Sequence, residues 1–503
     1  MQPTCFNPAG NTQPFTWDFH ERSTNRHPFD FVHHVKSRLS GSQAIRFPCQ
    51  PSIRGRRSGI SHGASPRPGE REGQDMSTPV WEMEPAQGQR RLVHVNATAT
   101  GGGVAELLHG LLRCQRSAGL NVGWAVIAGD EAFYAVTKLL HHLLHGAADP
   151  GKLRPVLLRT YHDRLASQVP WFAGRLTRDD VVVLHDPQTL GLAPALRALG
   201  ARVVWQCHVG ADVPPDRGPG TVWRAFEKEL SAAHAVVTTL PEFAPPSVPR
   251  ASRFVAAPAI DPAAPKNRHL TPAEITALLD EAGLTTTRTA PDVTVVQEAP
   301  LPGDARVVLQ ISRWDPLKDM PGVIRCIEGL APDVHLVLAG TDPTEIPDDP
   351  EGLAVLAEVH DTLAALSPQD RARVHLVSIS MRTPVRNALL VNALQRRADV
   401  VVQKSLEEGF GLTVTEAMVK GRAVVASAVG GLRLQVIDGR NGFLVDPTDL
   451  DGVRSALTRL LDNPQLRREL GEQARKDTLE RYTMPRLAAD YTVVVDTALE
   501  AAA

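Results

Sequence analysis

Two carboxylates flank a glycine turn in the segment from Ser405 to Glu416. Glu408 precedes the turn at 409–411, and seven residues separate it from Glu416. The apolar run at 400–403 predicts a buried strand before the turn, and the residues after it predict a helix. A strand, a glycine turn and a helix start present free backbone N–H groups at a sheet edge, where an anion can bind. Because carboxylates repel phosphate, Glu408 and Glu416 better suit the neutral hydroxyls of a sugar. The alternative is that both are acidic residues favoured by a helix dipole.

Two cations follow another predicted strand. Arg313 and Lys318 come after the apolar run at 306–311. Arginine suits bidentate contacts to phosphate, and lysine acts as a point charge. Fixed cations in a closed cleft would stabilise a diphosphate that gains negative charge as a bond to it breaks. The alternative is that both side chains are solvated surface cations.

A glycine-rich turn occupies a similar place near the start of the first half. The run 101–103 lies between a predicted strand at 91–95 and a helical pattern. Gly102 and Gly103 allow close approach of phosphate to the backbone and to the helix start. A tight strand–helix turn without a ligand explains the same glycines equally well.

Histidine and aspartate mark two more strand ends. His185 and Asp186 follow the apolar run at 181–184, where they could bind sugar hydroxyls. Asp186 before Pro187 would equally serve as a helix cap. His208 follows the next strand and is a similar candidate.

Metal ligands find little support. Asp449 and Asp451 open a predicted helix, so capping explains them. His141, His142 and His145 lie on another predicted helix, and we interpret them as a solvated face. We therefore expect no metal and no other cofactor.

The composition excludes several classes of protein. A length of 503 residues suffices for two or three domains, and 43% hydrophobic with 22% charged residues indicates a packed core. A net charge of −2 gives no basic bias toward nucleic acid. Five scattered cysteines without a Cys-x-x-Cys pair support neither a disulfide framework nor a zinc site. No apolar run reaches the roughly 18 residues that a membrane span needs, and no signal-peptide core is present, so we expect a cytoplasmic protein.

The N-terminal segment differs from the rest of the chain. Residues 1–75 are rich in Arg, His, Ser, Pro and Gly and have no apolar period, which predicts disorder. We predict that this disordered arm covers residues 1–85. Met76 is a candidate for the true start, and a chain that begins there is expected to fold and act as the full chain does. A basic arm for targeting or nucleic-acid binding is the alternative.

Strands and helices alternate from residue 90 onward, which predicts parallel sheets. A proline-rich break at 246–267 and a loop-like stretch at 283–304 separate two such halves. We therefore predict an α/β protein with two Rossmann-like domains that face each other across a cleft. The predicted domains cover 86–265 and 266–480, followed by a C-terminal helix over 481–503. The predicted strands are 91–95, 121–127, 181–184, 202–205, 235–239, 306–311, 334–338, 374–377, 399–402 and 423–426.

The carboxylate and cation motifs resemble those of retaining glycosyltransferases with two Rossmann-like domains, the GT-B type. In that family the first glutamate of the pair contacts the transferred sugar and the second holds the nucleotide ribose. The resemblance implies that Glu408, His185 and Asp186 act on the sugars. It also implies a set of donor-binding residues: Gly102, Gly103, Arg313, Lys318, Asn392, Gly409, Phe410, Gly411, Leu412 and Glu416.

Several segments are similar, more narrowly, to a trehalose glycosyltransferring synthase, which joins nucleotide-activated glucose to free glucose. They are Val93–Thr98, Gly101–Glu106, His185–Gln188, Val391–Gln395, Glu408–Met418 and Ala428–Gly431. The similarity implies a nucleotide-glucose donor as co-substrate and a small sugar acceptor, with neither nucleic acid nor membrane as a partner. A homodimer is one candidate for the oligomeric state.

One departure concerns the acceptor. The family usually shows Trp-Arg-Cys-His-Ile-Asp where this chain has Trp-Gln-Cys-His-Val-Gly at 205–210. The loss of a cation and a carboxylate from a strand end that should face the cleft predicts altered acceptor recognition. Two alternatives stay open: a retaining trehalose phosphorylase, and a nucleotide-sugar-binding protein without catalysis.

Overall fold

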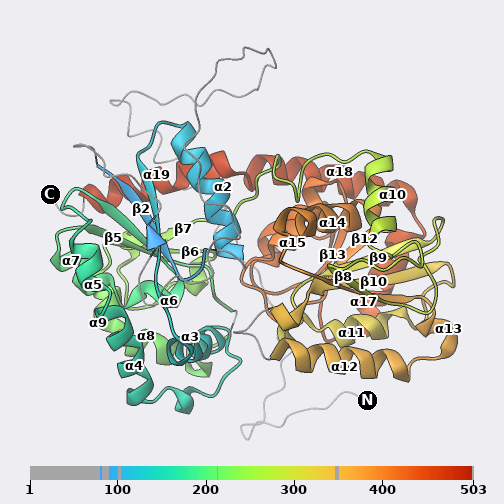
Figure 1. The fold of residues 1–503 in the computed structure, drawn as a ribbon, viewed down its shortest axis with the longest axis horizontal. Coiled ribbons are helices and arrows are strands. Elements are labelled where there is room, and N and C mark those ends of the chain that lie inside the picture. The colour runs from blue at the N-terminus through green and yellow to red at the C-terminus, as the bar shows by residue number, and fades with distance from the viewer. Residues whose placement is uncertain (1–79, 82–89, 100–102, 212, 346–350, 501–503) are drawn as a thin grey trace, which may run out of the picture. The chain divides into compact units, whose positions relative to one another are not determined.

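The computed structural model describes residues 80–81, 90–99, 103–211, 213–345 and 351–500. These residues form two α/β units, each built around a largely parallel sheet (Figure 1). The predicted fold class, two Rossmann-like domains, is confirmed. Val80 and Trp81, inside the predicted arm over 1–85, form a strand of the first sheet. The other residues of that arm, including Met76, lie outside the described residues.

The first sheet has the strand order β1-β3-β2-β4-β5-β6-β7. All neighbours are parallel except β1, which pairs antiparallel with β3. The central strand β4 is buried along its whole length, as expected of a parallel strand covered on both faces. The strands are β1 (Val80–Trp81), β2 (Leu92–Asn96), β3 (Val122–Val126), β4 (Val181–His185), β5 (Arg202–Cys207), β6 (Ala235–Thr238) and β7 (Arg253–Val255).

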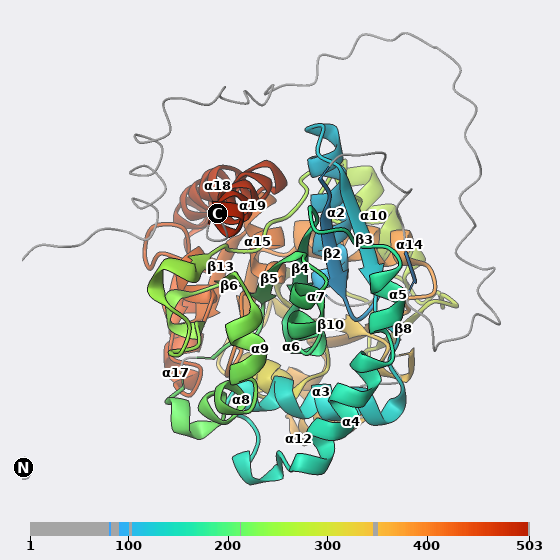
Figure 2. The same ribbon diagram turned by 90° about the vertical axis from the view of Figure 1, so that its left-hand side faces the viewer.

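Helices cover both faces of this sheet, and one of them comes from the far end of the chain. Leu107, Leu108 and Leu111 of α2 form a core on one face together with Leu487 and Tyr491 of α19. Figure 2 shows α2 and α19 on that side and α3, α8 and α9 toward the other. The helices of this unit are α2 (Gly103–Ser117), α3 (Glu131–Leu144), α4 (Pro155–Ala166), α5 (Val169–Ala173), α6 (Asp186–Leu190), α7 (Ala193–Ala198), α8 (Pro219–Ala225), α9 (Glu227–Ala232) and α19 (Met484–Glu500).

The second sheet has the strand order β14-β13-β12-β9-β10-β11-β8. Its strands are parallel except β8, which pairs antiparallel with β11. The strands are β8 (Val293–Val296), β9 (Arg306–Ile311), β10 (Val334–Thr341), β11 (Val374–Ile379), β12 (Val400–Gln403), β13 (Ala423–Ser427) and β14 (Phe443–Val445).

Helices likewise cover both faces of the second sheet. One apolar core joins it to α10, α14 and α15, and the other joins it to α11, α12 and α17. The helices are α10 (Pro272–Glu281), α11 (Met320–Ile324), α12 (Glu351–Ala365), α13 (Pro368–Arg371), α14 (Pro384–Arg397), α15 (Leu412–Val419), α16 (Leu432–Gln435), α17 (Leu450–Leu461) and α18 (Pro464–Arg481). Short 3-10 turns are η1 (Pro150–Lys152), η2 (Pro215–Arg217), η3 (Pro241–Phe243), η4 (Arg250–Ser252), η5 (Pro316–Lys318), η6 (Arg325–Ile327) and η7 (Pro343–Glu345).

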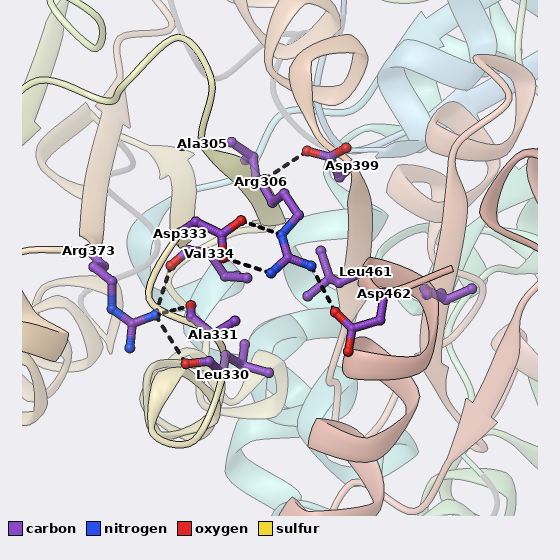
Figure 3. A network of polar contacts seen from close by, with 12 residues as sticks. Ala305, Arg306, Leu330, Ala331, Asp333, Val334, Arg373, Asp399, Leu461 and Asp462 are labelled. Atoms are coloured by element: carbon purple, nitrogen blue, oxygen red, sulfur yellow. Dashed lines mark hydrogen bonds and ion pairs between the residues drawn. The ribbon is translucent and has the colours of Figure 1, made fainter. Parts of the chain in front are cut away.

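A polar network fixes the amino ends of the second sheet's central strands (Figure 3). Arg306, the first residue of β9, makes two hydrogen bonds of 2.6 and 2.7 Å to Asp333, which precedes β10. It also donates to Asp462 at 2.9 Å. The carboxylate of Asp399, just before β12, accepts from the Val307 N–H at 2.9 Å. These contacts align the strands at the edge opposite to the one where the glycine turn follows β12.

The sequence prediction missed the edges of both sheets. The stretch 283–304, predicted as a loop, contains β8, and the proline-rich break at 246–267 contains β7. β14 was also missed. All three are short edge strands, whose apolar pattern is too brief to stand out. None of the helices that the structure describes is long and apolar enough to cross a membrane. The predicted boundary at 265/266 falls between β7 and α10, and the boundaries stay predictions.

Candidate active site

The carboxyl ends of β9 and β12 bring a cation and a carboxylate together. Lys318 lies in the 3-10 turn η5 after β9, and Glu408 lies in the loop after β12. The Lys318 ammonium donates to Glu408 at 2.7 Å, and Ser405 Oγ donates to the same carboxylate oxygen at 3.2 Å. Both charged side chains are largely buried, with 14% and 13% of their surface exposed. Arg313 is more exposed and donates to Asp315 at 2.9 Å.

The loop that carries Glu408 depends on glycine at specific points. Gly411 precedes α15 with φ of +86°, a left-handed conformation that L side chains rarely adopt. Gly430 has φ of +42°, and a Cβ there would lie 1.8 Å from the Glu408 carbonyl oxygen. Gly431 N–H donates to that same carbonyl at 3.1 Å. The glycines at 430–431 therefore let a second loop pack against the backbone of Glu408.

Substitution of Gly430 by alanine should move this loop. The positive φ and the backbone clash together are expected to lower the free energy of unfolding by about 2 kcal/mol. Denaturant unfolding measures this loss, and turnover should fall because Glu408 is displaced. Gly439→Ala is the matched control, since Gly439 also has a positive φ but a Cβ there meets nothing within 4 Å. A Gly430→Ala protein with the stability and turnover of the Gly439→Ala protein would contradict this view of the loop.

Three histidines form a column behind the strand ends of the first sheet, in which His94 and His185 are buried and His208 is partly exposed. His94 Nδ1 lies 2.9 Å from His185 Nε2, and His185 Nδ1 lies 3.0 Å from His208 Nε2. Gln115 Oε1 is 3.2 Å from the other nitrogen of His94. Burial lowers the pKa of His94 to about 4 and the pKa of His185 well below its ordinary value. Both rings are therefore neutral at pH 7, and each can donate through one nitrogen and accept through the other.

Asp186 supports His208 rather than capping a helix. Its backbone has φ of +61°, and its carboxylate accepts from the His208 N–H at 2.7 Å. His185 occupies the cap position of α6, without a side-chain cap hydrogen bond. The capping interpretation of Asp186 is therefore wrong, because the strained backbone turns the carboxylate toward β5. Burial raises the pKa of this carboxyl group.

The strand ends of the two sheets approach each other at the glycine turn. A Cβ at Gly409 would lie 2.7 Å from the His208 carbonyl oxygen. A Cβ at Gly103, the first residue of α2, would lie 3.5 Å from Leu412 Cδ1 at the start of α15. The structure thus places His185, His208, Gly103 and Glu408 around one region. Gly102 lies outside the described residues.

Glu416 is buried one turn into α15 and is paired with the segment that connects the two sheets. Its side chain is 6% exposed, and its Oε1 lies 3.7 Å from Lys266 Nζ. The same ammonium donates to both carboxylate oxygens of Glu106 on α2, at 2.9 and 2.7 Å. Glu416 Oε2 is buried and has no hydrogen-bond partner among the described residues.

Two predicted donor-binding side chains are buried and make packing contacts or backbone contacts. The Phe410 ring is buried against Tyr482 and Ala257, with ring centroids 5.5 Å apart in the Phe–Tyr pair. Asn392 is fully buried in α14, where it donates to the carbonyl oxygens of Pro265 and Arg268 at 2.9 Å. Leu412 packs against the Phe410 cluster, and Asn392 holds the backbone on both sides of Lys266, so the donor-binding role of these two side chains stays a prediction.

The expected position of Gln206 was wrong. Its side chain is 1% exposed and accepts a hydrogen bond from Tyr491 of α19, so it faces a helix rather than a cleft. Gly210 is buried against Phe243, and a Cβ there would lie 2.3 Å from that ring. The phenyl ring therefore occupies the space that an aspartate at 210 would need.

The histidines of α3 are not a solvated face. His145 is buried, with its ring 4.4 Å from that of His141. Burial lowers the pKa of His145 to about 4, and the charge of Lys318 acts in the same direction. Burial and the neighbouring charges, Arg313 and Lys318 among them, also lower the pKa of His141. The solvated interpretation is wrong for His145, because its ring is buried and packs against that of His141.

Sequence reasoning gave no individual role to His94 and Glu106, although both lie in segments that carry the resemblance, and it missed Gln115 and Lys266. His94 lies inside an apolar strand, where a polar residue in a buried run was the available signal. Lys266 lies in the proline-rich break and carried no motif. Among the described residues, no group of three or more His, Cys, Asp or Glu side chains could hold a metal ion.

Two α/β domains built on parallel sheets match the GT-B fold. Solved structures share this fold: the α,α-trehalose-6-phosphate synthase of Burkholderia multivorans superposes over 82% of this chain and all of its own, with a TM-score of 0.64 at 17% identity. Anabaena HepE, solved in complex with UDP and glucose, has a TM-score of 0.57 at 16% identity and covers 81% of this chain.

Family models place the chain more narrowly. Residues 94–245 match the trehalose synthase N-terminal domain, and residues 294–477 match glycosyl transferases group 1. The trehalose synthase of Rubrobacter xylanophilus is 34% identical over 405 residues, which cover 80% of this chain and 88% of that protein. The trehalose synthase of Pyrococcus horikoshii is 31% identical over 81% of this chain and 90% of its own length. The chain belongs to the trehalose synthase family, and it is a glycosyltransferase.

Proposed function

We propose that this enzyme transfers glucose from a nucleotide-glucose donor to a sugar acceptor, glucose, with retention of configuration, and so forms trehalose. The observation that carries the proposal is the largely buried Lys318–Glu408 pair at the tip of the second sheet, next to the His208 strand end of the first. The pair supplies a cation for a leaving diphosphate and a carboxylate for the sugar in one place.

The proposed reaction breaks the bond between the anomeric carbon and a diphosphate oxygen. A hydroxyl oxygen of the acceptor forms the new bond to that carbon, and its proton passes to the departing diphosphate. Arg313 and Lys318 stabilise the negative charge that grows on the diphosphate. Glu408 stabilises positive charge on the transferred sugar. His185 and Asp186, at the strand ends of the first sheet, orient the sugars. The cations supply the charge neutralisation that a metal provides elsewhere, so no metal is required.

A donor panel tests the proposal. The full chain is incubated with glucose and with UDP-, ADP-, GDP- or TDP-glucose in turn, and a nonreducing disaccharide is measured by its resistance to reducing-sugar reagents and its cleavage by a trehalase. At least one donor should give trehalose and release its nucleoside diphosphate in equal amount. EDTA in one arm tests the metal requirement. Binding of nucleotide-glucose without any transfer would support the catalytically inactive alternative.

Phosphorolysis is the second candidate, and one comparison favours it. A trehalose phosphorylase of Pleurotus pulmonarius is 27% identical over 76% of this chain and 53% of its own length. In that reaction Arg313 and Lys318 would hold inorganic phosphate instead of a diphosphate. Incubation with trehalose and inorganic phosphate should then release glucose and glucose phosphate without any nucleotide, whereas our proposal expects no such products.

Acceptor use should differ from strict selection of glucose. Gly210 and the Phe243 ring leave no carboxylate at a strand end where relatives usually have one. A polar site that lacks such a group discriminates less between hydroxyl patterns. We expect a high KM for glucose and kcat/KM within about tenfold for at least one other hexose. A hexose panel measures this, and tight, exclusive use of glucose would contradict it.

A further inference from the structure

Lys266 joins helices of the two sheets through their carboxylates. Its ammonium donates to both oxygens of Glu106 in the first turn of α2 and lies 3.7 Å from Glu416 Oε1 on α15. The Lys266 side chain is 19% exposed and that of Glu416 is 6% exposed, whereas Glu106 is 46% exposed, so the Glu416 side of this contact is the one shielded from solvent. Burial works against the charge of Lys266, but Glu416 and Glu106 outweigh it and raise the pKa. Lys266 is therefore charged at neutral pH.

Glu416 needs a cation to stay ionised. Burial raises the pKa of this carboxyl group, and the nearby charge of Glu106 adds to the increase. Lys266 and Lys420 act in the opposite direction. Lys420 is the residue that follows α15, and it is a weak counter-charge because burial, together with the charge of Arg396, lowers its pKa to about 7. Its ammonium donates to the backbone carbonyl of Glu416, at 2.9 Å, and not to the carboxylate.

Lys266 is held in place by helices of the second sheet. Asn392 and Arg396 of α14 donate to the backbone carbonyls on either side of it. Lys420 donates to Asn267 Oδ1 at 3.2 Å. This fixes the connecting segment to the unit that carries Glu416, so the ammonium keeps its place beside that carboxylate.

We propose that Lys266 is a positioning residue of the donor site: it keeps Glu416 as a carboxylate aimed at vicinal hydroxyls and links it to the first turn of α2 through Glu106. The inference deepens the proposed function and rests on it, because the hydroxyls are those of the donor ribose. Glu416 Oε2 has no partner among the described residues, and Oε1 has only the ion pair with Lys266, so both oxygens can accept from a cis-diol. The link to α2 couples ribose binding to the helix that follows the glycine-rich turn.

Replacement of Lys266 by methionine should give ribose recognition a pH dependence. Without Lys266 the pKa of Glu416 rises further, so the group becomes protonated as the pH falls and accepts hydroxyls poorly. The dissociation constants of UDP, ADP and GDP, each beside its 2′,3′-dideoxy form, are measured by calorimetry between pH 6 and 9. The dissociation constant of the dideoxy form is divided by that of the ribonucleotide, and this ratio cancels the titration of the diphosphate itself. In the wild-type protein this ratio should not change with pH. In the Lys266→Met protein it should fall by about tenfold from pH 9 to pH 6, which corresponds to a pKa shift of about one unit.

Three variants separate positioning from simple stabilisation. Lys266→Arg should restore the flat profile, and Lys266→Gln serves as the uncharged variant if the methionine variant does not fold. Arg113→Met is the matched control, because it breaks another ion pair between α2 and the connecting segment, Arg113–Asp261 at 3.0 Å, without contact to Glu416. An uncharged variant with a flat ratio, or a ratio reduced equally at every pH, would overturn the inference. If the wild-type protein binds none of the ribonucleotides, the proposed function fails instead.

Discussion

Lys318→Ala should lower turnover by about 10²- to 10³-fold, and Arg313→Ala should act similarly, as expected for loss of one transition-state donor. The reason is that the leaving diphosphate gains negative charge only as the reaction approaches the transition state. A diphosphate gains negative charge as its bond to glucose breaks, so a fixed cation stabilises the transition state more than the bound donor. Lys318 is the stronger case, because its buried ammonium is held 2.7 Å from Glu408. Initial rates with the donor identified by the panel give kcat and KM for each variant.

The kinetic pattern distinguishes this role from a structural one. Loss of a cation that acts on the leaving group should lower kcat and kcat/KM together, whereas loss of ground-state binding alone should raise KM. Lys318→Arg keeps the charge and should recover part of the rate. Lys476→Ala removes an exposed cation from α18 and controls for net charge. Near-normal turnover of both Lys318→Ala and Arg313→Ala would reject the assignment.

The strands β4 and β12 were predictable because each is a short run of apolar residues that ends in a polar one. Val181–His185 and Val400–Gln403 are buried along their full length, so the sequence signal and the physical environment coincide. The same logic located Glu408, Lys318 and His185, since the carboxyl ends of parallel strands share one edge. Short edge strands such as β8 carried no comparable signal.

Contacts between distant segments could not be predicted in this way. Gln206 meets Tyr491, and Glu416 meets Lys266, only because α19 and the connecting segment cross between the two units. The α3 histidines seemed solvated because an isolated helix with three polar rings would expose them. Burial of the His145 side chain in the folded protein reverses that expectation. A sequence motif predicts the strand end at which a residue lies, whereas the contacts of its side chain depend on tertiary packing.

The two carboxylates of the Glu-x7-Glu segment should fail in different ways when they are neutralised. Glu408→Gln should lower kcat by about 10²-fold or more with a small change in donor KM, because this side chain stabilises charge on the reacting sugar. Its position favours that role: it lies on the loop after β12, fixed by Lys318 and Ser405, and its neighbour Gly409 approaches the His208 carbonyl.

Glu416→Gln should instead raise the donor KM and the nucleoside diphosphate dissociation constant by about tenfold, with a small effect on kcat. A neutral amide still bonds to hydroxyls but loses the charge-assisted part of the interaction, which is worth about 1–2 kcal/mol. Glu416 lies within α15 and is paired with Lys266, away from the Lys318–Glu408 pair. Glu407→Gln, a carboxylate on the same loop as Glu408, controls for a general change in loop charge. Rapid-quench single turnovers would separate binding from chemistry, and an identical kinetic signature for Glu408→Gln and Glu416→Gln would show that the two carboxylates do not divide the work as we infer.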